Sequence, residues 1–491
     1  MSESRTDPPI AVGIDLGTSS VKVVAIGFDA ELIGEGAADF PTSGALAQQA
    51  EQAPADWLHA TSSAMRRLVQ TVAQTRGAEW KERIAAIGLT GQLPTLVCLA
   101  DHGLLAPAIT WKDGRADAWA ATRIDSAQRA GMYARTGMPI DGRYLAPMLQ
   151  FHFADRMGQI RAILSAKDYL LSELTGMRIT EPSTAAGYGV YDLKERCFSK
   201  DLCAFWNLPV GLLPPIQPAN SLAGRLSEAG AALLGLRPGV AVSTGCADSV
   251  CAAYAMAGLD QRVVSVSFGS SAVIIGADEQ LRLDASARYL VTPHVDDNWY
   301  GREMDLLASG TGYQWLSDLF GWQDGQIDSY AVDSTPGARG LCFAPYLAGG
   351  EQGALWNPRL QGAIFGLNLR HSPSDIARAY LEGVFYEVRR CVDVLAETSP
   401  VESVRVSGNI VHSPGSCQML ADILDRVVVS VPDKSPAAIG AALLARRICD
   451  GAAAHGPRPS LSPRTTRPNR AAAQQYASLY RAYVERAARC E

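Results

Sequence analysis

An aspartate followed by a turn of small residues is the first feature that could do chemistry. Asp15 ends an apolar run that begins at Ala11, and the turn Gly-Thr-Ser-Ser at 17–20 separates it from a second β-branched run. A carboxylate at the end of a buried strand costs free energy unless it is paired, hydrogen-bonded or bound to a cation. Asp15 therefore either caps the turn or faces a Mg²⁺-bound nucleotide, whose phosphates then meet the turn's amides and hydroxyls.

A second carboxylate, Asp248, follows a strand-like segment in the stretch that runs from Pro238 to Gly258. This stretch reads as a buried strand, a tight turn and a helix rich in small residues that begins near Asp248. Asp248 as an N-cap is one interpretation, because aspartate is a common cap. The other is a general base that accepts a proton from a substrate hydroxyl.

Polar residues suited to a polyol follow two further apolar segments. In TWKDGRAD, residues 110–117, Asp113 could accept hydrogen bonds from hydroxyls and Arg115 could donate them. Gln92 lies on a glycine-flanked turn in GLTGQLP, where its amide could do either. The alternative for Asp113 and Arg115 is an exposed charged turn.

The element that must position Asp15 is repeated in the second half of the chain. Val263–Ala277 is an apolar run, a Gly-Ser-Ser turn and another apolar run, with Gly269 aligned to Gly17 at an offset of 252 residues. Ser267 stands where the first copy has Asp15. Such internal similarity predicts two duplicated α/β domains, with a nucleotide held between them. No Gly-Lys dipeptide exists, which excludes a P-loop, and no G-x-G-x-x-G follows a strand.

Strand and helix signals alternate through both halves, which is typical of α/β domains. We expect a strand, a turn and a strand over 84–100, a strand and glycine turn over 403–410, and a surface loop over 451–468. Amphipathic or small-residue patterns predict helices over 167–176, 374–395, 435–447 and 471–490.

Composition narrows the class of protein. The chain has 491 residues, which suggests two to four domains, and its net charge of −6 without a long basic run argues against nucleic acid as a main partner. The first ten residues do not resemble a signal peptide, and no apolar stretch approaches the roughly 20 residues that span a membrane. Ten cysteines are scattered without C-x-x-C, which favours a reducing cytoplasm. A homodimer stays open as the oligomeric state.

The ordered set of motifs from Ala11 to about Arg446 resembles the FGGY family of carbohydrate kinases, and within it the xylulokinases most. Each motif alone is weak, but their order and spacing together are specific. The motifs are GIDLGTSSVK, TGQ, WKDGR, KDYL, EPSTAAGYGVYDL, GCADS, SFGSSAV, APYLAGGE, IFGL, ARAYLEGVFYE and QMLADIL.

The resemblance implies an α/β protein of two ribonuclease H-like domains, of the actin and hexokinase type, with a nucleotide cleft between them. Residues 1–256 would be the sugar-binding side and 257–491 the nucleotide-binding side, with a C-terminal loop and helix over 451–491. ATP and Mg²⁺ are the implied cofactors. The implied site residues are Asp15 for Mg²⁺; Thr18, Ser19, Gly269, Ser270, Gly408 and Asn409 for the nucleotide; Asp248 as general base; and Gln92, Leu93, Pro94, Trp111, Asp113, Arg115 and Asp248 for the sugar.

Three departures from the family pattern concern the ligands. Xylulokinases usually carry Met-His, which contacts the ketose, where this chain has Leu93 and Pro94. The adenosine-side GGGA reads Gly-Asn-Ile-Val at 408–411, and GERTP reads GEQGA. The implied reaction is phosphorylation of D-xylulose to xylulose 5-phosphate, or of another ketose, a polyol or a deoxy sugar. A nucleotide-switched binding protein on the actin-like fold is the non-enzymatic alternative.

Overall fold

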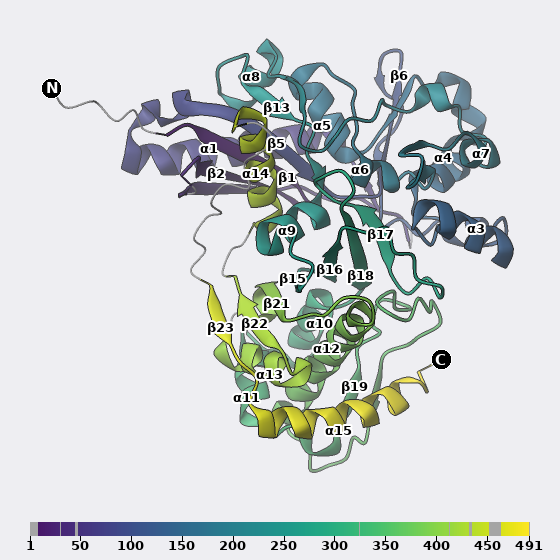
Figure 1. Ribbon diagram of the computed structural model, residues 1–491, viewed down its shortest axis with the longest axis vertical. Coiled ribbons are helices and arrows are strands. Elements are labelled where there is room, and N and C mark those ends of the chain that lie inside the picture. Colours follow the sequence, from purple (N-terminus) through teal and green to yellow (C-terminus); the bar gives the residue numbers. More distant parts are fainter. Residues whose placement is uncertain are drawn as a thin grey trace. The chain divides into compact units, whose positions relative to one another are not determined.

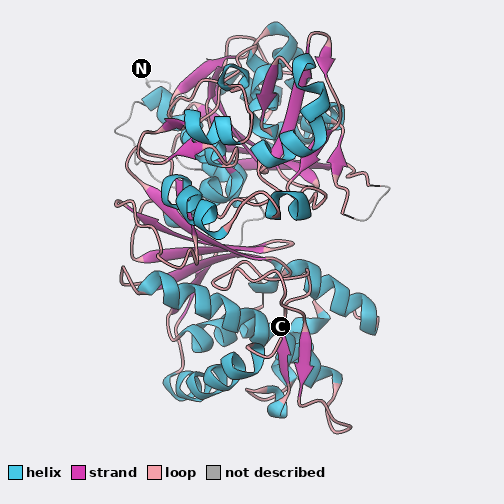
Figure 2. Ribbon diagram, turned by 90° about the vertical axis from the view of Figure 1, so that its right-hand side faces the viewer, coloured by secondary structure: helices cyan, strands magenta, loops and turns pink. Residues whose placement is uncertain are grey.

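The computed structural model describes residues 8–29, 31–44, 48–323, 325–411, 413–431, 435–450 and 463–490, and forms two compact units. The first unit contains the chain as far as Ala255, the segment Val291–Tyr300 and helix α14 (Pro436–Asp450). The second contains Met256–Leu290, Gly301–Lys434 and the C-terminal segment. In each unit a large sheet has helices packed against it (Figure 2). The main boundary between the two units therefore lies between Ala255 and Met256, and two later segments of the chain belong to the first unit.

The first sheet has the order β12-β13-β5-β1-β2-β3, with β14 pairing β5 as a seventh strand. Strand β2 pairs antiparallel with β1 on one side and with β3 on the other. Strand β5 is parallel to β1, and β13 and β14 are parallel to β5. The central strands are continuous apolar runs because both faces of the sheet are covered. The bounds are β1 (Ile10–Leu16), β2 (Ser20–Gly27), β3 (Leu32–Asp39), β5 (Ile84–Gly91), β12 (Leu222–Arg225), β13 (Ala241–Ser243) and β14 (Cys246–Ala247).

The second sheet repeats this arrangement, with the order β17-β18-β16-β15-β21-β22-β23. Here β15 and β16 form the antiparallel hairpin, and β21 is parallel to β15 as β5 is to β1. The predicted pair of hairpins is therefore confirmed. The bounds are β15 (Val263–Phe268), β16 (Ala272–Asp278), β17 (Leu290–Pro293), β18 (Tyr300–Leu306), β21 (Ser403–Gly408), β22 (Val427–Ser430) and β23 (Arg464–Thr466).

Smaller sheets and surrounding helices complete both units. The first unit holds a five-stranded sheet of β4 (Glu51–Gln52), β8 (Ala108–Thr110), β6 (Thr95–Ala100), β7 (Gly103–Leu104) and β9 (Ala162–Leu164), and a β10 (Tyr191–Asp192) and β11 (Cys197–Phe198) pair; the second holds a β19 (Cys342–Ala344) and β20 (Ala363–Phe365) pair. The α-helices are α1 (Pro54–Arg76), α2 (Asp117–Ala121), α3 (Ser126–Thr136), α4 (Leu145–Phe153), α5 (Ala166–Thr175), α6 (Pro182–Ala186), α7 (Lys200–Phe205), α8 (Glu228–Leu234), α9 (Asp248–Ala257), α10 (Gly310–Phe320), α11 (Gln326–Asp333), α12 (Pro373–Ala396), α13 (Pro414–Leu424), α14 and α15 (Arg470–Ala487).

Helix α14 packs against β1 and β5, which are more than 300 residues away in sequence (Figure 1). A Cβ atom at Gly13 on β1 would lie 1.8 Å from the Ala438 carbonyl oxygen, and one at Gly88 on β5 would lie 1.9 Å from that of Ala441. On the helix itself, a Cβ at Gly440 would lie 2.0 Å from the Cys251 carbonyl oxygen of α9. Small residues therefore allow the backbones of the sheet and both helices to approach one another closely.

The helices predicted over 167–176, 374–395, 435–447 and 471–490 are confirmed by α5, α12, α14 and α15, with ends shifted by a few residues. The surface loop predicted over 451–468 is wrong for Arg464–Thr466, which is strand β23 and pairs antiparallel with β22. Its three residues are too few to give a periodic signal, and the edge position is what orders them. Residues 451–462 of that prediction lie outside the described residues. Among the described helices, none is long and apolar enough to cross a membrane.

The contact between β1 and α14 gives a stability prediction. Gly13→Ala places a methyl group within the Ala438 backbone, so we expect unfolding free energy to fall by about 3 kcal/mol, the upper part of the range for overpacking. Gly131→Ala on α3 is the control, because a Cβ there meets nothing within 4 Å and alanine favours helix by about 0.5–1 kcal/mol. Urea unfolding measures both. Equal stability of the two variants would contradict the packing described.

Candidate active site

Three neighbouring parallel strands of the first unit end at one edge of the sheet. On β1, Asp15 is paired with Thr90 of β5, and on the other side of β5 the same Thr90 is paired with Cys246 of β14. Gln92 follows β5 directly and Asp248 follows β14. Ligand sites in sheets of this kind lie at the carboxyl ends of the strands. The sheet therefore brings together Asp15, Gln92 and Asp248, which the sequence analysis singled out separately.

The turn before Asp248 is built around Gly245. Its φ is +78°, and a Cβ atom there would lie 1.8 Å from the Leu89 carbonyl oxygen of β5. Glycine therefore lets the chain cross close to β5 and then pair with it, where the Thr90 hydroxyl donates to the Cys246 carbonyl oxygen over 2.7 Å. Asp248 is half-buried and begins α9, and its carboxylate accepts a hydrogen bond from the Ser249 amide at 2.8 Å.

Buried polar side chains from two motifs hold the segment behind Asp248. Lys167, from KDYL, donates to the Thr244 carbonyl oxygen at 3.0 Å and to Asp168 at 2.7 Å. Ser183, from EPSTAA, accepts from the Ala247 amide at 2.9 Å and donates to Glu181. These motifs therefore support the strand and turn that carry Asp248, a role that the sequence analysis did not give them.

Asp15 is 7% exposed, and its Oδ1 atom has no hydrogen-bond partner among the described residues. Burial raises the pKa of this carboxyl to about 6, an effect that the charge of Lys22 opposes. An unpaired buried carboxylate oxygen fits a cation or a water bound to one. The described residues contain no group of three or more His, Cys, Asp or Glu side chains arranged for a metal. A cation here would therefore take its other ligands from phosphate oxygens and water, as Mg²⁺ commonly does.

The turn at 17–20 is fixed by contacts from other elements. The Gly17 amide donates to the Ser20 carbonyl oxygen at 3.0 Å. The Thr18 carbonyl oxygen accepts from the Gln52 side chain at 2.8 Å, and the Thr18 hydroxyl accepts from the Trp111 indole at 3.2 Å. Trp111, predicted on the sugar side, therefore contacts the predicted phosphate turn, and Ser19 is exposed on it.

Gln52 is a site residue that sequence reasoning missed. It lies on β4 and is 1% exposed, and its amide makes four hydrogen bonds, one of them to Gln92. Nothing in its neighbourhood, a polar stretch before Pro54, marks it as buried. Leu93 and Pro94, which follow Gln92 directly in sequence and are joined by a cis peptide bond, are half-buried. A Cβ at Gly187 would lie 3.2 Å from the Leu93 side chain.

Asp113 and Arg115 bind each other. Arg115 donates to Asp113 from its main-chain amide at 3.1 Å and from its guanidinium at 2.6–3.0 Å, and it also donates to Glu51 at 2.6 Å. Burial alone would raise the pKa of Asp113, but hydrogen bonds from Arg115 and Ala50 outweigh it and hold that pKa below its usual value. His152 lies 3.8 Å from Asp113, and burial lowers its pKa. Much of the hydrogen-bonding capacity predicted for a polyol is thus used within the protein.

A second Asp-Gly-Arg turn packs against the first. Asp141 accepts from the amide and guanidinium of Arg143 in the same pattern, and a Cβ at Gly142 would lie 2.4 Å from the backbone of Ala116 and Asp117. Burial and the neighbouring Asp141 raise the pKa of Asp117 to about 6. Only the first of these two turns was predicted from the sequence.

In the second unit, the residues predicted for the nucleotide lie together at the ends of β15 and β21. Gly408 is paired with Phe268, which precedes Gly269, and a Cβ at Gly408 would lie 1.9 Å from the Phe268 carbonyl oxygen. The Gly310 and Thr311 amides at the start of α10 donate to the carbonyl oxygens of Gly269 and Ser270, both at 3.0 Å. Gly269, Ser270 and Asn409 are exposed.

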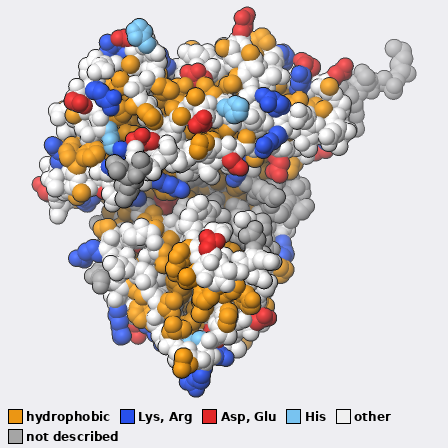
Figure 3. All heavy atoms as spheres, turned by 180° about the vertical axis from the view of Figure 1, so that it is seen from behind, with side chains coloured by type: hydrophobic (Ala, Val, Ile, Leu, Met, Phe, Trp, Pro, Cys, Tyr) orange, Lys and Arg blue, Asp and Glu red, His pale blue; other side chains and the backbone are white. Residues whose placement is uncertain are grey.

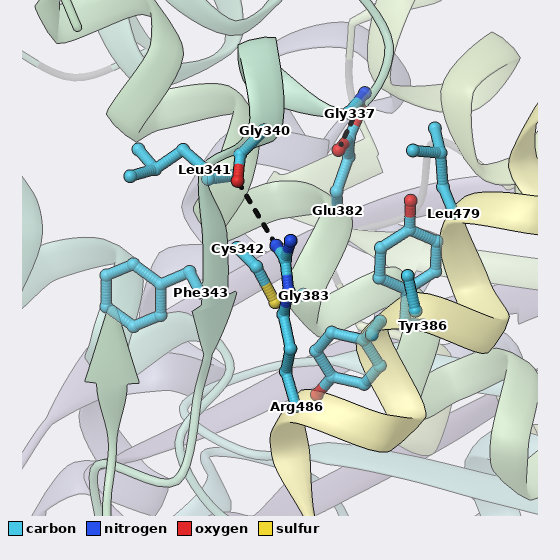
Figure 4. A pocket seen from close by; sticks show the side chains of 13 residues that line it. Gly337, Gly340, Leu341, Cys342, Phe343, Glu382, Gly383, Tyr386, Leu479 and Arg486 are labelled. Atoms are coloured by element: carbon cyan, nitrogen blue, oxygen red, sulfur yellow. Dashed lines mark hydrogen bonds between the residues drawn. The ribbon is translucent and has the colours of Figure 1, made fainter. Parts of the chain in front are cut away.

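A cavity of about 80 Å³ in the second unit is separate from these residues (Figure 4). It lies between α12, α15 and β19, and Arg486 donates to the Gly340 carbonyl oxygen at 3.1 Å beside it. Its lining includes none of the predicted site residues. Hydrophobic side chains also gather on one surface of this unit (lower part of Figure 3).

The raised pKa of Asp15 predicts that replacing this residue stabilises the folded protein by an amount that depends on pH. Because the folded-state pKa of about 6 lies above the unfolded value near 3.8, Asp15 contributes stability below about pH 4 that is lost as pH rises through 6. As pH rises from 4 to 7.5, the free energy of unfolding of Asp15→Asn should therefore increase relative to that of the native protein. The increase should reach about 3 kcal/mol, at about 1.4 kcal/mol per pKa unit. Urea unfolding without nucleotide or divalent cation measures this, with the exposed Asp201→Asn as control. A native-to-variant difference that does not change with pH would contradict it.

Comparison with known proteins identifies the family. Residues 10–255 match the N-terminal domain of the FGGY family of carbohydrate kinases, and residues 264–448 match its C-terminal domain. Xylulose kinase of Lactococcus lactis subsp. lactis (strain IL1403) is 25% identical over 445 residues, 89% of this chain and 87% of that protein. Gluconokinase of Bacillus subtilis (strain 168) is 25% identical over 454 residues, 88% of this chain and 86% of that protein.

A solved structure, that of xylulose kinase from Rhodospirillum rubrum, matches with a TM-score of 0.85 and 27% identity, and covers 98% of both chains. The predicted fold, two domains of the actin and hexokinase type, is confirmed by this match and by the repeated sheets. The two matched domains together cover most of the sequence. The chain belongs to the FGGY family of carbohydrate kinases.

Proposed function

We propose that this kinase transfers the γ-phosphoryl group of ATP to a hydroxyl of a small sugar, with D-xylulose as the first candidate. The observation that supports the proposal most is the common edge of β1, β5 and β14. It collects Asp15 and Gln92, each with a buried oxygen that has no partner among the described residues, and the half-buried Asp248. Unsatisfied buried acceptors next to a carboxylate at a strand edge fit a site completed by ligands.

Asp248 is proposed as the general base. Its carboxylate accepts the proton of the attacking hydroxyl, whose oxygen forms the new bond to phosphorus while the bond to the ADP oxygen breaks. Its position at the start of α9, behind a turn that Lys167 and Ser183 hold in place, limits its movement. A fixed base is useful here because positioning and electrostatics account for most of the rate of phosphoryl transfer.

The phosphates are proposed to bind at the two small-residue turns. In the first unit, Thr18 and Ser19 would contact them, and Asp15 would hold Mg²⁺, directly or through water. Bound Mg²⁺ would neutralise charge on the phosphate oxygens. In the second unit, Gly269, Ser270, Gly408 and Asn409 would contact the nucleotide. Three of these four residues are exposed, at the ends of adjacent parallel strands, where turn residues can contact an anion.

The sugar is proposed to contact Gln92, Leu93, Pro94 and the first Asp-Gly-Arg turn, with Trp111 beside it. Because Asp113 and Arg115 satisfy each other, they would act as a rigid pair in which Arg115, the more exposed of the two, offers its remaining guanidinium N–H groups to hydroxyls. The Leu93-Pro94 pair lacks the polar group of the usual Met-His. Another ketose, a polyol, a deoxy sugar or, given the gluconokinase relative, a sugar acid is the alternative substrate. A cytoplasmic location belongs to the same proposal.

The experiment that tests the proposal is a substrate panel. ADP release is followed with ATP and Mg²⁺ against ketoses, aldoses, polyols, deoxy sugars and aldonates. We expect one sugar to stand out in kcat/KM, with a sugar phosphate as the product by mass spectrometry. ADP release that is independent of every sugar would contradict the proposal.

The Asp248 assignment gives a kinetic prediction. Asp248→Asn removes the base but keeps the shape and helix-starting character of the residue, so we expect kcat to fall by about 10²- to 10⁴-fold while stability stays within about 1 kcal/mol. Sugar and nucleotide should still bind in calorimetry. Asp125→Asn is the matched control, because Asp125 caps α3 by accepting from the Gln128 amide. A near-native kcat for Asp248→Asn would leave Asp248 with a structural role alone.

A further inference from the structure

We propose that Gln52 is a positioning residue that turns the Gln92 amide so that its oxygen faces the substrate and accepts a hydrogen bond from a substrate hydroxyl. The inference rests on the proposed function and narrows the class of substrate. It comes from a chain of hydrogen bonds that joins Trp57, Gln52, Gln92 and the turn at 17–20.

Trp57 fixes which end of the Gln52 amide is the oxygen. Its indole nitrogen lies 2.9 Å from Gln52 Oε1, and Trp57 is fully buried. An indole N–H can only donate, so the atom that faces it must be an acceptor. The atom of Gln52 that faces Trp57 is therefore the amide oxygen and not the amide nitrogen.

The opposite end of Gln52 gives the same answer. Its nitrogen lies 2.8 Å from the Thr18 carbonyl oxygen and 2.7 Å from the Thr42 hydroxyl. A carbonyl oxygen can only accept, so it requires the amide N–H₂ of Gln52. A reversed amide would place N–H₂ against the N–H of Trp57 and oxygen against oxygen at Thr18, and the loss of both bonds in a buried site is costly.

The orientation of Gln52 then determines that of Gln92. Gln52 Oε1 lies 2.8 Å from the Gln92 side chain, and an acceptor there requires the nitrogen of Gln92, which therefore donates. The other amide atom, Gln92 Oε1, is buried and has no partner among the described residues. The backbone of Gln92 is held as well, because its amide donates to the Leu16 carbonyl oxygen at 2.8 Å. The atom of Gln92 that still lacks a hydrogen-bond partner is thus an acceptor.

An acceptor at this position selects a donor. A sugar hydroxyl can donate to it, whereas a carboxylate, a ketone oxygen or an ether presents a second acceptor and leaves both groups unsatisfied. A site built to pair with a hydroxyl rejects an analogue that cannot do so. The substrate group beside Gln92 is therefore a hydroxyl, which favours a neutral polyhydroxy sugar over one with its acid group at this place.

The first experiment tests the hydrogen-bond network through protein stability and needs no sugar. In Gln92→Glu, the new carboxyl faces the oxygen of Gln52 and must stay protonated to donate to it. The pKa of the carboxyl in the folded protein should then lie above that of the unfolded chain, near 4.3. The stability that depends on its protonation is present below that value and is lost as pH rises through the folded pKa.

We therefore expect the Tm of Gln92→Glu to fall progressively below that of the native protein between pH 4.5 and pH 7.5. Gln128→Glu is the matched control, because Gln128 Oε1 already accepts from the Asp125 amide and an ionised carboxylate fits there. Lys167 near Gly91 would favour ionisation at position 92, while Asp15 on the adjacent strand and Glu51 would oppose it. Repeating both measurements with Asp15→Asn removes the titration of Asp15. A Gln92→Glu protein whose Tm follows the control at every pH would overturn the assigned orientation.

The second experiment measures the binding of substrate analogues. For the sugar that the panel identifies, each hydroxyl is replaced in turn by hydrogen and by fluorine, which can accept but not donate. At one position we expect both analogues to bind about tenfold more weakly than the parent in calorimetry, and Gln92→Leu to bind all three alike. Fluorine analogues that bind as tightly as the parent at every position would overturn the inference. If no sugar is phosphorylated, the proposed function fails, while the stability experiment still decides the orientation of Gln92.

Discussion

Parallel pairing of β5 with β1 on one side and β14 on the other is the constraint on which the rest of the first unit depends. It places the ends of three strands side by side, so residues far apart in sequence share one edge. The pairing needs close backbone approaches that a side chain would prevent, at Gly245 against β5 and at Gly13 and Gly88 against α14. Packing by small residues, more than any single polar contact, therefore positions the candidate site.

Polar groups around this edge divide into those that are satisfied and those that are not. Gln52 uses all four hydrogen-bonding positions of its amide, and Asp113 and Arg115 satisfy each other. Asp15 Oδ1 and Gln92 Oε1 remain without partners among the described residues. Since buried polar groups are nearly always paired, these two oxygens fit groups that a ligand or a bound water completes. The supporting network gives the ligand-facing atoms a fixed direction and leaves them little freedom to reorganise.

Much of this could be predicted from sequence. Asp15 and Asp248 each follow an apolar, β-branched segment and precede a small-residue turn or helix, so local pattern located them, and the repeated hairpin predicted the duplicated sheets. Three features could not be predicted in this way. The place of α14 depends on contacts with β1 and β5 across more than 300 residues. The burial of Gln52 depends on its tertiary partners. The pairing of Asp113 with Arg115 depends on side-chain geometry that residue types alone leave open.

The proposed function requires that the edge of β1, β5 and β14 binds the reacting groups. The most direct measurement is a crystal structure with Mn²⁺ in place of Mg²⁺, a non-hydrolysable ATP analogue and the preferred sugar, with anomalous scattering used to locate the manganese. We expect an anomalous peak beside Asp15, within reach of its carboxylate directly or through one water. We also expect a sugar hydroxyl within about 3.2 Å of the Asp248 carboxylate. A fully occupied sugar that lies away from Asp248, with manganese elsewhere, would contradict the claim.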